Sequence, residues 1–278
     1  MDLAPSLKEM PYPQVIPRPN RHWPGRTAPW PVEGIGPVTI ERVRSVMEAE
    51  GYRGDPPLGP HIMGPDDLEV GLPAGYRPPT SHSAVLIALF EEDNDVRIIL
   101  TRRSSKLRNH AHQVAFPGGR LDEGESFLDA ALREAHEEVG LDPSLATFLG
   151  HLDPLRTAST KFRVQPMVVA LQGRPQLQAN EAEVERIFDH SFTELLQPGV
   201  YHEEFWDRGD LGFPRESEHE LHLLPVSFFE VAGDMIWGMT GRLLVQFINL
   251  LAGTTMHALP AEIEGLRVRN VLEIDDSV

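Results

Sequence analysis

The segment from Gly119 to Leu141 constrains the fold of this chain most, because it specifies a turn, a helix and the face that the helix buries. Ser126 can accept a hydrogen bond from the first helical turn, and Gly140 can end the helix in the left-handed conformation. The pattern therefore predicts a helix over about residues 126–139. Its apolar residues form one stripe that packs the helix against a core, namely Phe127, Leu128, Ala131, Leu132, Ala135 and Val139.

Three glutamates lie on one edge of that stripe. Glu134, Glu137 and Glu138 stand at positions i, i+3 and i+4, which a helix brings to neighbouring places on its surface. Their mutual repulsion costs roughly a few tenths of a kcal/mol per pair, and a hard divalent cation would relieve it. On their own, the three carboxylates fit either a metal site or a solvated acidic helix face.

The residues around the helix extend the pattern and favour the metal site. A glycine turn, a carboxylate at Glu125 and an arginine at Arg133 complete the Nudix box, Gly-x5-Glu-x7-Arg-Glu-U-x-Glu-Glu-x-Gly-U, in which U is apolar. Every fixed position is matched, so the chain resembles the Nudix hydrolases. The resemblance implies an α/β fold, a Nudix-type α/β/α sandwich with a mixed sheet, and metal-dependent hydrolysis of a diphosphate linkage.

The resemblance also implies which residues hold the metal ion. Glu134 and Glu138 are expected to be the principal ligands of Mg²⁺ or Mn²⁺, and Glu137 to be a further ligand or to orient water. The backbone carbonyl of Gly118 is an additional candidate ligand. The metal then neutralises phosphate oxygens, activates water and aligns the attack. Three glutamates outside the box are candidates for a general base, with Glu183 favoured: Glu181, Glu183 and Glu185.

Four positions of the box are expected to shape it rather than to react. By the same resemblance, Glu125 and Arg133 should pair with each other and brace the loop. Gly119 should belong to the turn before the helix, and Gly140 should end the helix. The box therefore divides into residues that bind the metal ion and residues that hold those ligands in place.

A second resemblance concerns the substrate and lies just before the box. Residues 100–119 read Leu-Thr-Arg-Arg-Ser-Ser-Lys-Leu-Arg-Asn-His-Ala-His-Gln-Val-Ala-Phe-Pro-Gly-Gly. They are similar to the motif that precedes the box in the coenzyme A (CoA) diphosphatase branch, with His112 where that branch usually has glycine. Arginine can bind phosphate through two parallel hydrogen bonds. The expected substrate-binding residues are Arg102, Arg103, Arg108 and His110.

The expected reaction is hydrolysis of the diphosphate of CoA or its derivatives to 4′-phosphopantetheine, or its acyl form, and adenosine 3′,5′-bisphosphate. The alternative substrate is another diphosphate, such as ADP-ribose or a dinucleoside polyphosphate, because His112 could reshape the pocket. A catalytically silent ligand-binding or RNA-binding module is disfavoured, since the box keeps all four glutamates.

Composition limits the partners and the compartment. A formal net charge of −17 would repel long polyanions, so nucleic acid is not an expected partner. The absence of cysteine excludes disulfides, thiolate metal sites and cysteine nucleophiles. Residues 1–10 lack the apolar core of a secretory signal, and Leu243–Ala252 is too short to span a bilayer. No membrane partner, a cytoplasmic location and a homodimer are therefore expected.

Proline divides the chain into three parts. Sixteen of the 25 prolines lie in residues 1–80, which are expected to form an extended arm with one short helix behind Thr39. Residues 81–253 are the expected hydrolase domain, and residues 254–278 are expected to form a C-terminal tail.

Apolar runs predict the elements of the domain. Strands are expected at 84–90 and 96–102, joined as a hairpin, and then at about 147–152, 163–171, 184–189 and 221–229. Pro225 marks the last strand as an edge or bulged strand. Ser191 and Glu194 predict a capping box, and a final amphipathic helix should stop near Gly253.

Overall fold

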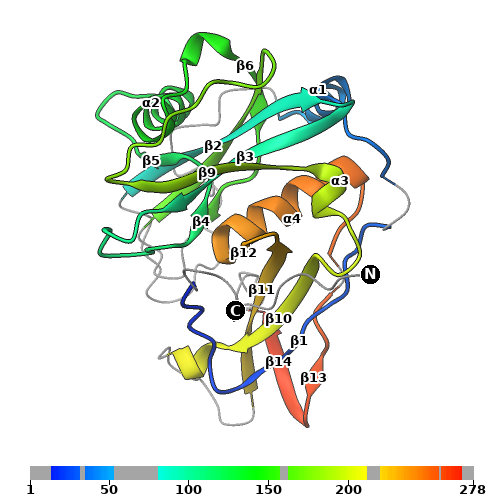
Figure 1. The fold of residues 1–278 in the computed structure, drawn as a ribbon. Coiled ribbons are helices and arrows are strands. Elements are labelled where there is room, and N and C mark those ends of the chain that lie inside the picture. Colours follow the sequence, from blue (N-terminus) through cyan, green and yellow to red (C-terminus); the bar gives the residue numbers. More distant parts are fainter. Residues whose placement is uncertain are drawn as a thin grey trace.

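A computed structural model of the chain describes residues 14–31, 35–52, 81–156, 162–211, 220–256 and 258–270 (Figure 1). These residues form two β-sheets, and helix α4 (Gly238–Ala252) lies between them. None of the helices in these ranges is long and apolar enough to cross a membrane.

The first sheet has eight strands and is mixed, as expected. Its central strands β2 and β8 run parallel, and the other pairs are antiparallel. The order is β4-β3-β2-β8-β6, with β5 also paired to β2, β7 to β8 and β9 to β3. The strands are β2 (Ser81–Glu92), β3 (Asp95–Arg103), β4 (Val114–Ala115), β5 (Gly118–Arg120), β6 (Ala146–His151), β7 (Leu155–Arg156), β8 (Phe162–Leu171) and β9 (Val184–Ser191).

Helices cover both faces of this sheet, which confirms the predicted sandwich. Alternate residues of β2 point to opposite faces, so Leu86 and Phe90 pack towards α2 (Phe127–Val139), whereas Ile87 packs towards α4. Helix α1 (Ile40–Ala49) joins α4 on the second face. The three glutamates of the box helix therefore lie in one helical layer, and the largest apolar core lies between the sheet and the helices on its other face.

The predicted helix ends are confirmed. Ser126 accepts a hydrogen bond from the Asp129 N–H, and Gly140 adopts the left-handed conformation at the end of α2. Thr39 caps α1 in the same way, and Gly253 ends α4. The capping box before α3 (Phe192–Leu195) is also present. Two short 3-10 helices complete the helical elements, η2 (Pro143–Leu145) and η3 (Arg208–Leu211).

A second sheet of six strands was not expected. Its order is β1-β10-β11-β14-β13, and β12 also pairs with β11. The strands are β1 (His22–Pro24), β10 (Tyr201–Asp207), β11 (Glu220–Val231), β12 (Asp234–Trp237), β13 (Glu262–Ile263) and β14 (Leu266–Asn270). The described parts of the expected arm and tail thus contribute strands to this sheet, although the division into arm, domain and tail stays a prediction.

Strand β11 shows how the sheet accommodates its proline. Pro225 pairs with Phe205 of β10 on one side. On the other side, β14 pairs with residues 220–223 and β12 with residues 228–231, which leaves Pro225 between the two partners. The strand is therefore internal to the sheet rather than at its edge, and the proline lies where no donor is needed on that side.

Candidate functional site

The acidic edge of α2 faces the glycines of β5. The backbone N–H of Gly118 donates to Oε2 of Glu138 at 3.3 Å. A Cβ atom at Gly119 would overlap the carboxylate of Glu134, so a side chain at this position would displace the glutamate. The two glycines therefore let the strand approach the helix closely enough to contact both carboxylates.

The predicted pairing of Arg133 with Glu125 is present. Arg133 donates from Nε to Oε1 of Glu125 at 2.9 Å and from Nη2 to Oε2 at 3.1 Å. Its Nη2 also donates to the carbonyl of Arg120 at 2.9 Å, and the Asp122 N–H donates to Glu125 at 2.9 Å. The arginine thus ties the helix to the loop that precedes it.

The same arginine also holds two of the expected metal ligands. Nη1 of Arg133 donates to Oε1 of Glu134 at 3.0 Å and to Oε2 of Glu137 at 3.3 Å. Across the described ranges, no three His, Asp or Glu side chains converge closely enough to hold a metal ion as they stand. Each of these contacts uses one carboxylate oxygen, Oε1 of Glu134 and Oε2 of Glu137.

Burial and mutual repulsion make the acidic cluster suitable for a cation. Glu138 is only 5% exposed, and this burial raises its pKa to about 7, although the Gly118 N–H and the charge of Arg103 oppose the rise. Burial also raises the pKa of Glu134, and Arg133 opposes that shift. Glu183 raises the pKa of both carboxyl groups further. Hard oxygen donors that repel one another suit a divalent cation.

The candidates for a general base have different surroundings. Glu183 is exposed, and its charge acts on Glu134 and Glu138, so it lies beside the cluster. Glu181 is also exposed. Glu185 forms an ion pair with Arg102 and lies 2.9 Å from Nδ1 of His112. Of the three candidate bases, Glu183 is thus the one whose charge acts on the expected metal ligands.

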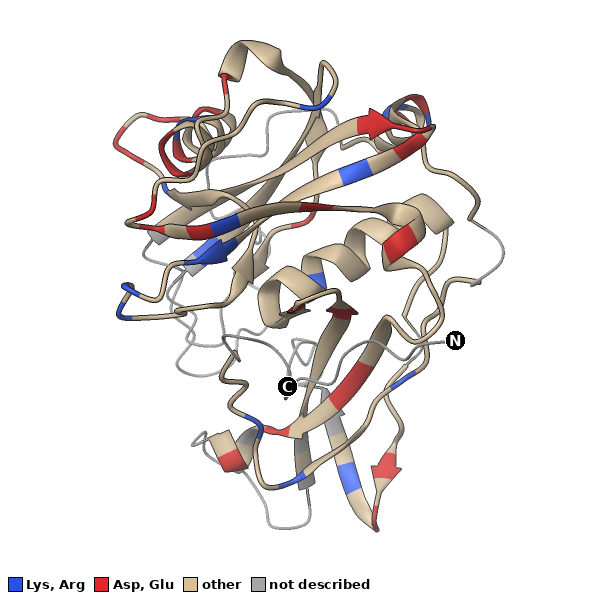
Figure 2. Cartoon of the chain, in the orientation of Figure 1, with Lys and Arg blue, Asp and Glu red and all other residues tan. Residues whose placement is uncertain are grey.

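The basic residues before the box also divide by environment (Figure 2). Arg102 is buried and pairs with Asp234 at 3.1 Å and Glu185 at 3.2 Å. Its guanidinium is therefore paired inside the protein, and its predicted contact with substrate stays a prediction. Arg103 is half-buried and acts on Glu138, and its Nε is buried with no hydrogen-bond partner in the described part of the chain.

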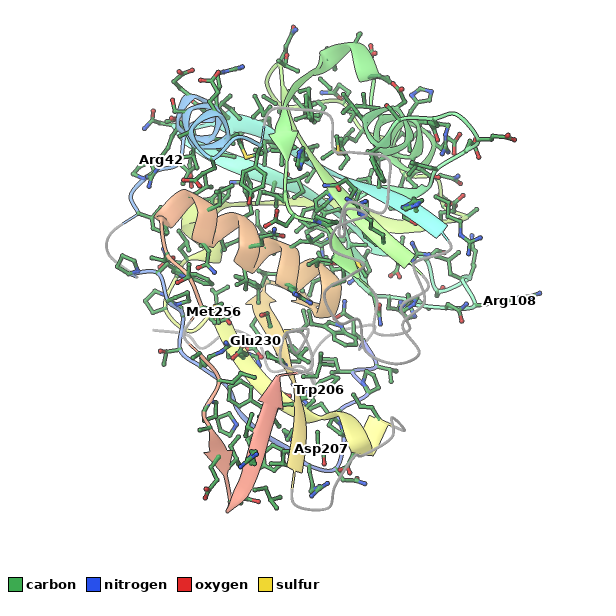
Figure 3. The ribbon with its side chains drawn as sticks, turned by 180° about the vertical axis from the view of Figure 1, so that it is seen from behind. Arg42, Arg108, Trp206, Asp207, Glu230 and Met256 are labelled. Carbon is green, nitrogen blue, oxygen red and sulfur yellow. The ribbon has the colours of Figure 1, made fainter. Side chains whose placement is uncertain are left out.

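The remaining substrate candidates lie in the loop between β3 and β4. Arg108 is exposed and extends away from the body of the molecule (Figure 3). His110 is exposed, and its Nδ1 lies 2.9 Å from Oε1 of Gln113. Among the substrate candidates, Arg103 is therefore the one whose charge acts on Glu138.

Two residues of this region carry no local signal in the sequence. Asp234 begins β12 and reaches Arg102 across 132 positions of the chain. Gln14 donates from Nε2 to the carbonyl of His112 at 2.7 Å, across 98 positions. Neither residue belongs to a motif, so only the tertiary structure identifies them.

Comparison with known proteins shows which family the chain resembles. The model of the NUDIX domain family matches residues 80–207. A protein of Yersinia enterocolitica named "uncharacterized Nudix hydrolase NudL" is 35% identical over 187 residues, which cover 66% of this chain and 89% of that protein. Nudix hydrolase 22, chloroplastic, of Arabidopsis thaliana is 39% identical over 182 residues, which cover 63% of this chain and 56% of that protein.

A second Arabidopsis relative, Nudix hydrolase 15, mitochondrial, is 36% identical over 200 residues, which cover 69% of this chain and 64% of that protein. The match therefore spans less than two thirds of both plant relatives. Among solved structures, a MutT/nudix family protein from Enterococcus faecalis has a TM-score of 0.40 and 15% identity, with 76% of this chain and 74% of that chain covered.

Proposed function

The chain belongs to the Nudix hydrolase family, and on this premise we propose that it hydrolyses the diphosphate linkage of CoA or its derivatives. The observation that carries the proposal is the acidic cluster of α2 beside Arg103, whose motif resembles that of the CoA diphosphatase branch. The expected products are 4′-phosphopantetheine, or its acyl form, and adenosine 3′,5′-bisphosphate.

The residues fit a divalent cation, Mg²⁺ or Mn²⁺. Glu134 and Glu138 would be the principal ligands, with Glu137 and the carbonyl of Gly118 as further candidates. When bound, the cation would neutralise phosphate oxygens and lower the pKa of water. The support for this assignment is the buried, mutually repelling pair of carboxylates, which the cation would relieve.

The protein itself would bind and orient the diphosphate. Arg103 is the proposed phosphate ligand, because it is only half-buried and its charge acts on Glu138. Glu183 is the proposed group that accepts the proton of the attacking water, since it is exposed beside the same cluster. Arg108 and His110 stay candidates for contacts with the outer part of the substrate.

The backbone conformation at His112 is compatible with the motif of the CoA branch. The CoA branch usually has glycine there, and His112 adopts the positive φ of 61° that glycine favours. Its ring lies against Glu185, with Nδ1 2.9 Å from the carboxylate, so the histidine satisfies the backbone requirement of the motif. ADP-ribose and dinucleoside polyphosphates are the second candidates.

Steady-state kinetics on CoA, ADP-ribose and a dinucleoside polyphosphate test the proposal. We expect the highest kcat/KM on CoA in the presence of Mg²⁺ or Mn²⁺, and we expect Glu138→Gln to abolish turnover while the protein stays folded. A kcat/KM on ADP-ribose equal to or above that on CoA would refute the CoA assignment. Full activity of Glu138→Gln would refute the metal assignment.

Three further expectations stay predictions. A cytoplasmic location is proposed from the sequence, although two plant relatives carry the names chloroplastic and mitochondrial. A homodimer is proposed, and its test is the mass of the particle in solution. Nucleic acid is not a proposed partner, because the net charge is −17.

A further inference from the structure

The loop that carries Arg103 is closed by its own backbone. The N–H of Arg103 donates to the carbonyl of Gln113 at 2.9 Å, and the N–H of His112 donates to the carbonyl of Arg103 at 3.0 Å. Arg103, the last residue of β3, thus pairs through its backbone with both His112 and Gln113. We call residues 103–113 the recognition loop.

His112 is in a conformation that a histidine rarely adopts. Its φ of 61° lies in the left-handed region, where the backbone of a residue other than glycine is strained. Such strain persists only where the surrounding contacts hold the residue in place. The contacts on His112 should therefore determine the shape of the recognition loop.

Two contacts from distant segments hold His112. Its Nδ1 lies 2.9 Å from Oε2 of Glu185 on β9, and its carbonyl accepts from Nε2 of Gln14 at 2.7 Å. Glu185 also pairs with the buried Arg102, which pairs in turn with Asp234 of β12. The loop is thus attached to β9, to the arm and, through Arg102, to the second sheet.

We propose that His112 and Glu185 form a positioning pair that fixes the recognition loop against Arg103 at the end of β3, and thereby determines how tightly the enzyme holds a substrate phosphate. This inference rests on the proposed function, because it takes Arg103 as the phosphate ligand. The second sheet and the arm support the pair through Asp234 and Gln14.

Kinetics of three variants test the pair. His112→Gly keeps the backbone conformation and removes the ring, whereas His112→Asn tolerates the same φ and keeps a polar side chain that can reach Glu185. We expect His112→Gly and Glu185→Gln to raise KM for the diphosphate about tenfold, which is the loss of one good hydrogen bond, with kcat within about threefold. His112→Asn should restore most of the affinity. An unchanged KM in His112→Gly would overturn the proposal.

Glu203→Gln is the matched control. Glu203 is a buried carboxylate that pairs with Arg26 and joins the arm to β10. The substitution removes a buried ion pair of the second sheet without touching the recognition loop, so its KM should equal that of the wild type. If Glu203→Gln raised KM as much as Glu185→Gln, general loosening of the fold would explain the result and the proposal would fail.

A double-mutant cycle tests whether the pair acts through Arg103. Arg103→Gln alone should raise KM. On that background His112→Gly should raise KM little further, because the arginine through which His112 acts is already absent. Additive losses in the double variant would show that His112 acts by another route.

A measurement without substrate separates this proposal from the proposed function. The Nε–Hε resonance of Arg103 in a ¹⁵N spectrum, assigned through Arg103→Gln, should shift in His112→Gly and Glu185→Gln but not in Glu203→Gln. If no diphosphate is hydrolysed, the proposed function fails, and the spectrum still decides the positioning role. If hydrolysis occurs and the resonance does not move, only the positioning role fails.

Discussion

Replacing Glu138 by glutamine should stabilise the metal-free protein at alkaline pH. Burial raises the pKa of this carboxyl from 4.5 to about 7, so ionising it costs more in the folded state than in the unfolded chain. The rise in pKa corresponds to a loss of roughly 3 kcal/mol in the free energy of unfolding, at pH values above the pKa of both the folded and the unfolded state. Glutamine has the same shape, can still accept the Gly118 N–H, and does not ionise.

The sign of the pH dependence follows from the raised pKa. Below about pH 4.5 the carboxyl is protonated in both the folded and the unfolded state, so it does not lower the free energy of unfolding. Between pH 4.5 and 7 the unfolded chain ionises first, so the folded protein loses stability as the pH rises. We therefore expect Glu138→Gln to exceed the wild type in free energy of unfolding by about 3 kcal/mol at pH 8, and by under about 1 kcal/mol at pH 5.

Urea denaturation in the presence of a chelator measures this difference. Glu137→Gln is the matched control, because the Glu137 side chain is 54% exposed and its charge is already solvated. Adding Mn²⁺ should stabilise the wild type more than Glu138→Gln, since the cation binds the folded carboxylate. Equal stability of Glu138→Gln and wild type at pH 8 without metal would refute the argument from burial.

Three other substitutions test the parts of the box. Gly119→Ala places a Cβ against the Glu134 carboxylate, so Mn²⁺ affinity measured by calorimetry should fall at least about tenfold, and unchanged affinity would contradict the packing argument. Ser126→Ala removes the cap of α2 and should cost about 1 kcal/mol in urea denaturation, whereas Ser126→Asp should retain the cap. Glu125→Gln weakens the brace on Arg133 and should lower the free energy of unfolding by about 1 kcal/mol, and a gain in stability would show that the pair does not hold the loop.

Local signals predicted the helices and most strands of the first sheet. The ends of α2 are fixed by Ser126 and Gly140, whose effects act within one helical turn. The hairpin of β2 and β3 follows from two apolar runs separated by a short polar turn. Such features could be predicted because the residues that decide them are neighbours in the chain.

The second sheet had no comparable signal. Strand β1 pairs with β10 across about 180 positions, and β14 pairs with β11 after a long connection. Short strands from a proline-rich segment and from the end of the chain resemble loops until partners are found for them. Their pairing therefore depends on the packing of the whole chain around α4.

The candidate site shows the same division. By itself, the sequence determined the acidic helix, the brace between Glu125 and Arg133, and the family, because fixed spacings on one helix and its loop encode them. Only the tertiary structure decided that Arg102 is buried against Asp234 while the charge of Arg103 acts on Glu138. The physical reason is that spacing determines which residues share a face, whereas burial and the choice of ionic partner depend on segments that folding brings from elsewhere in the chain.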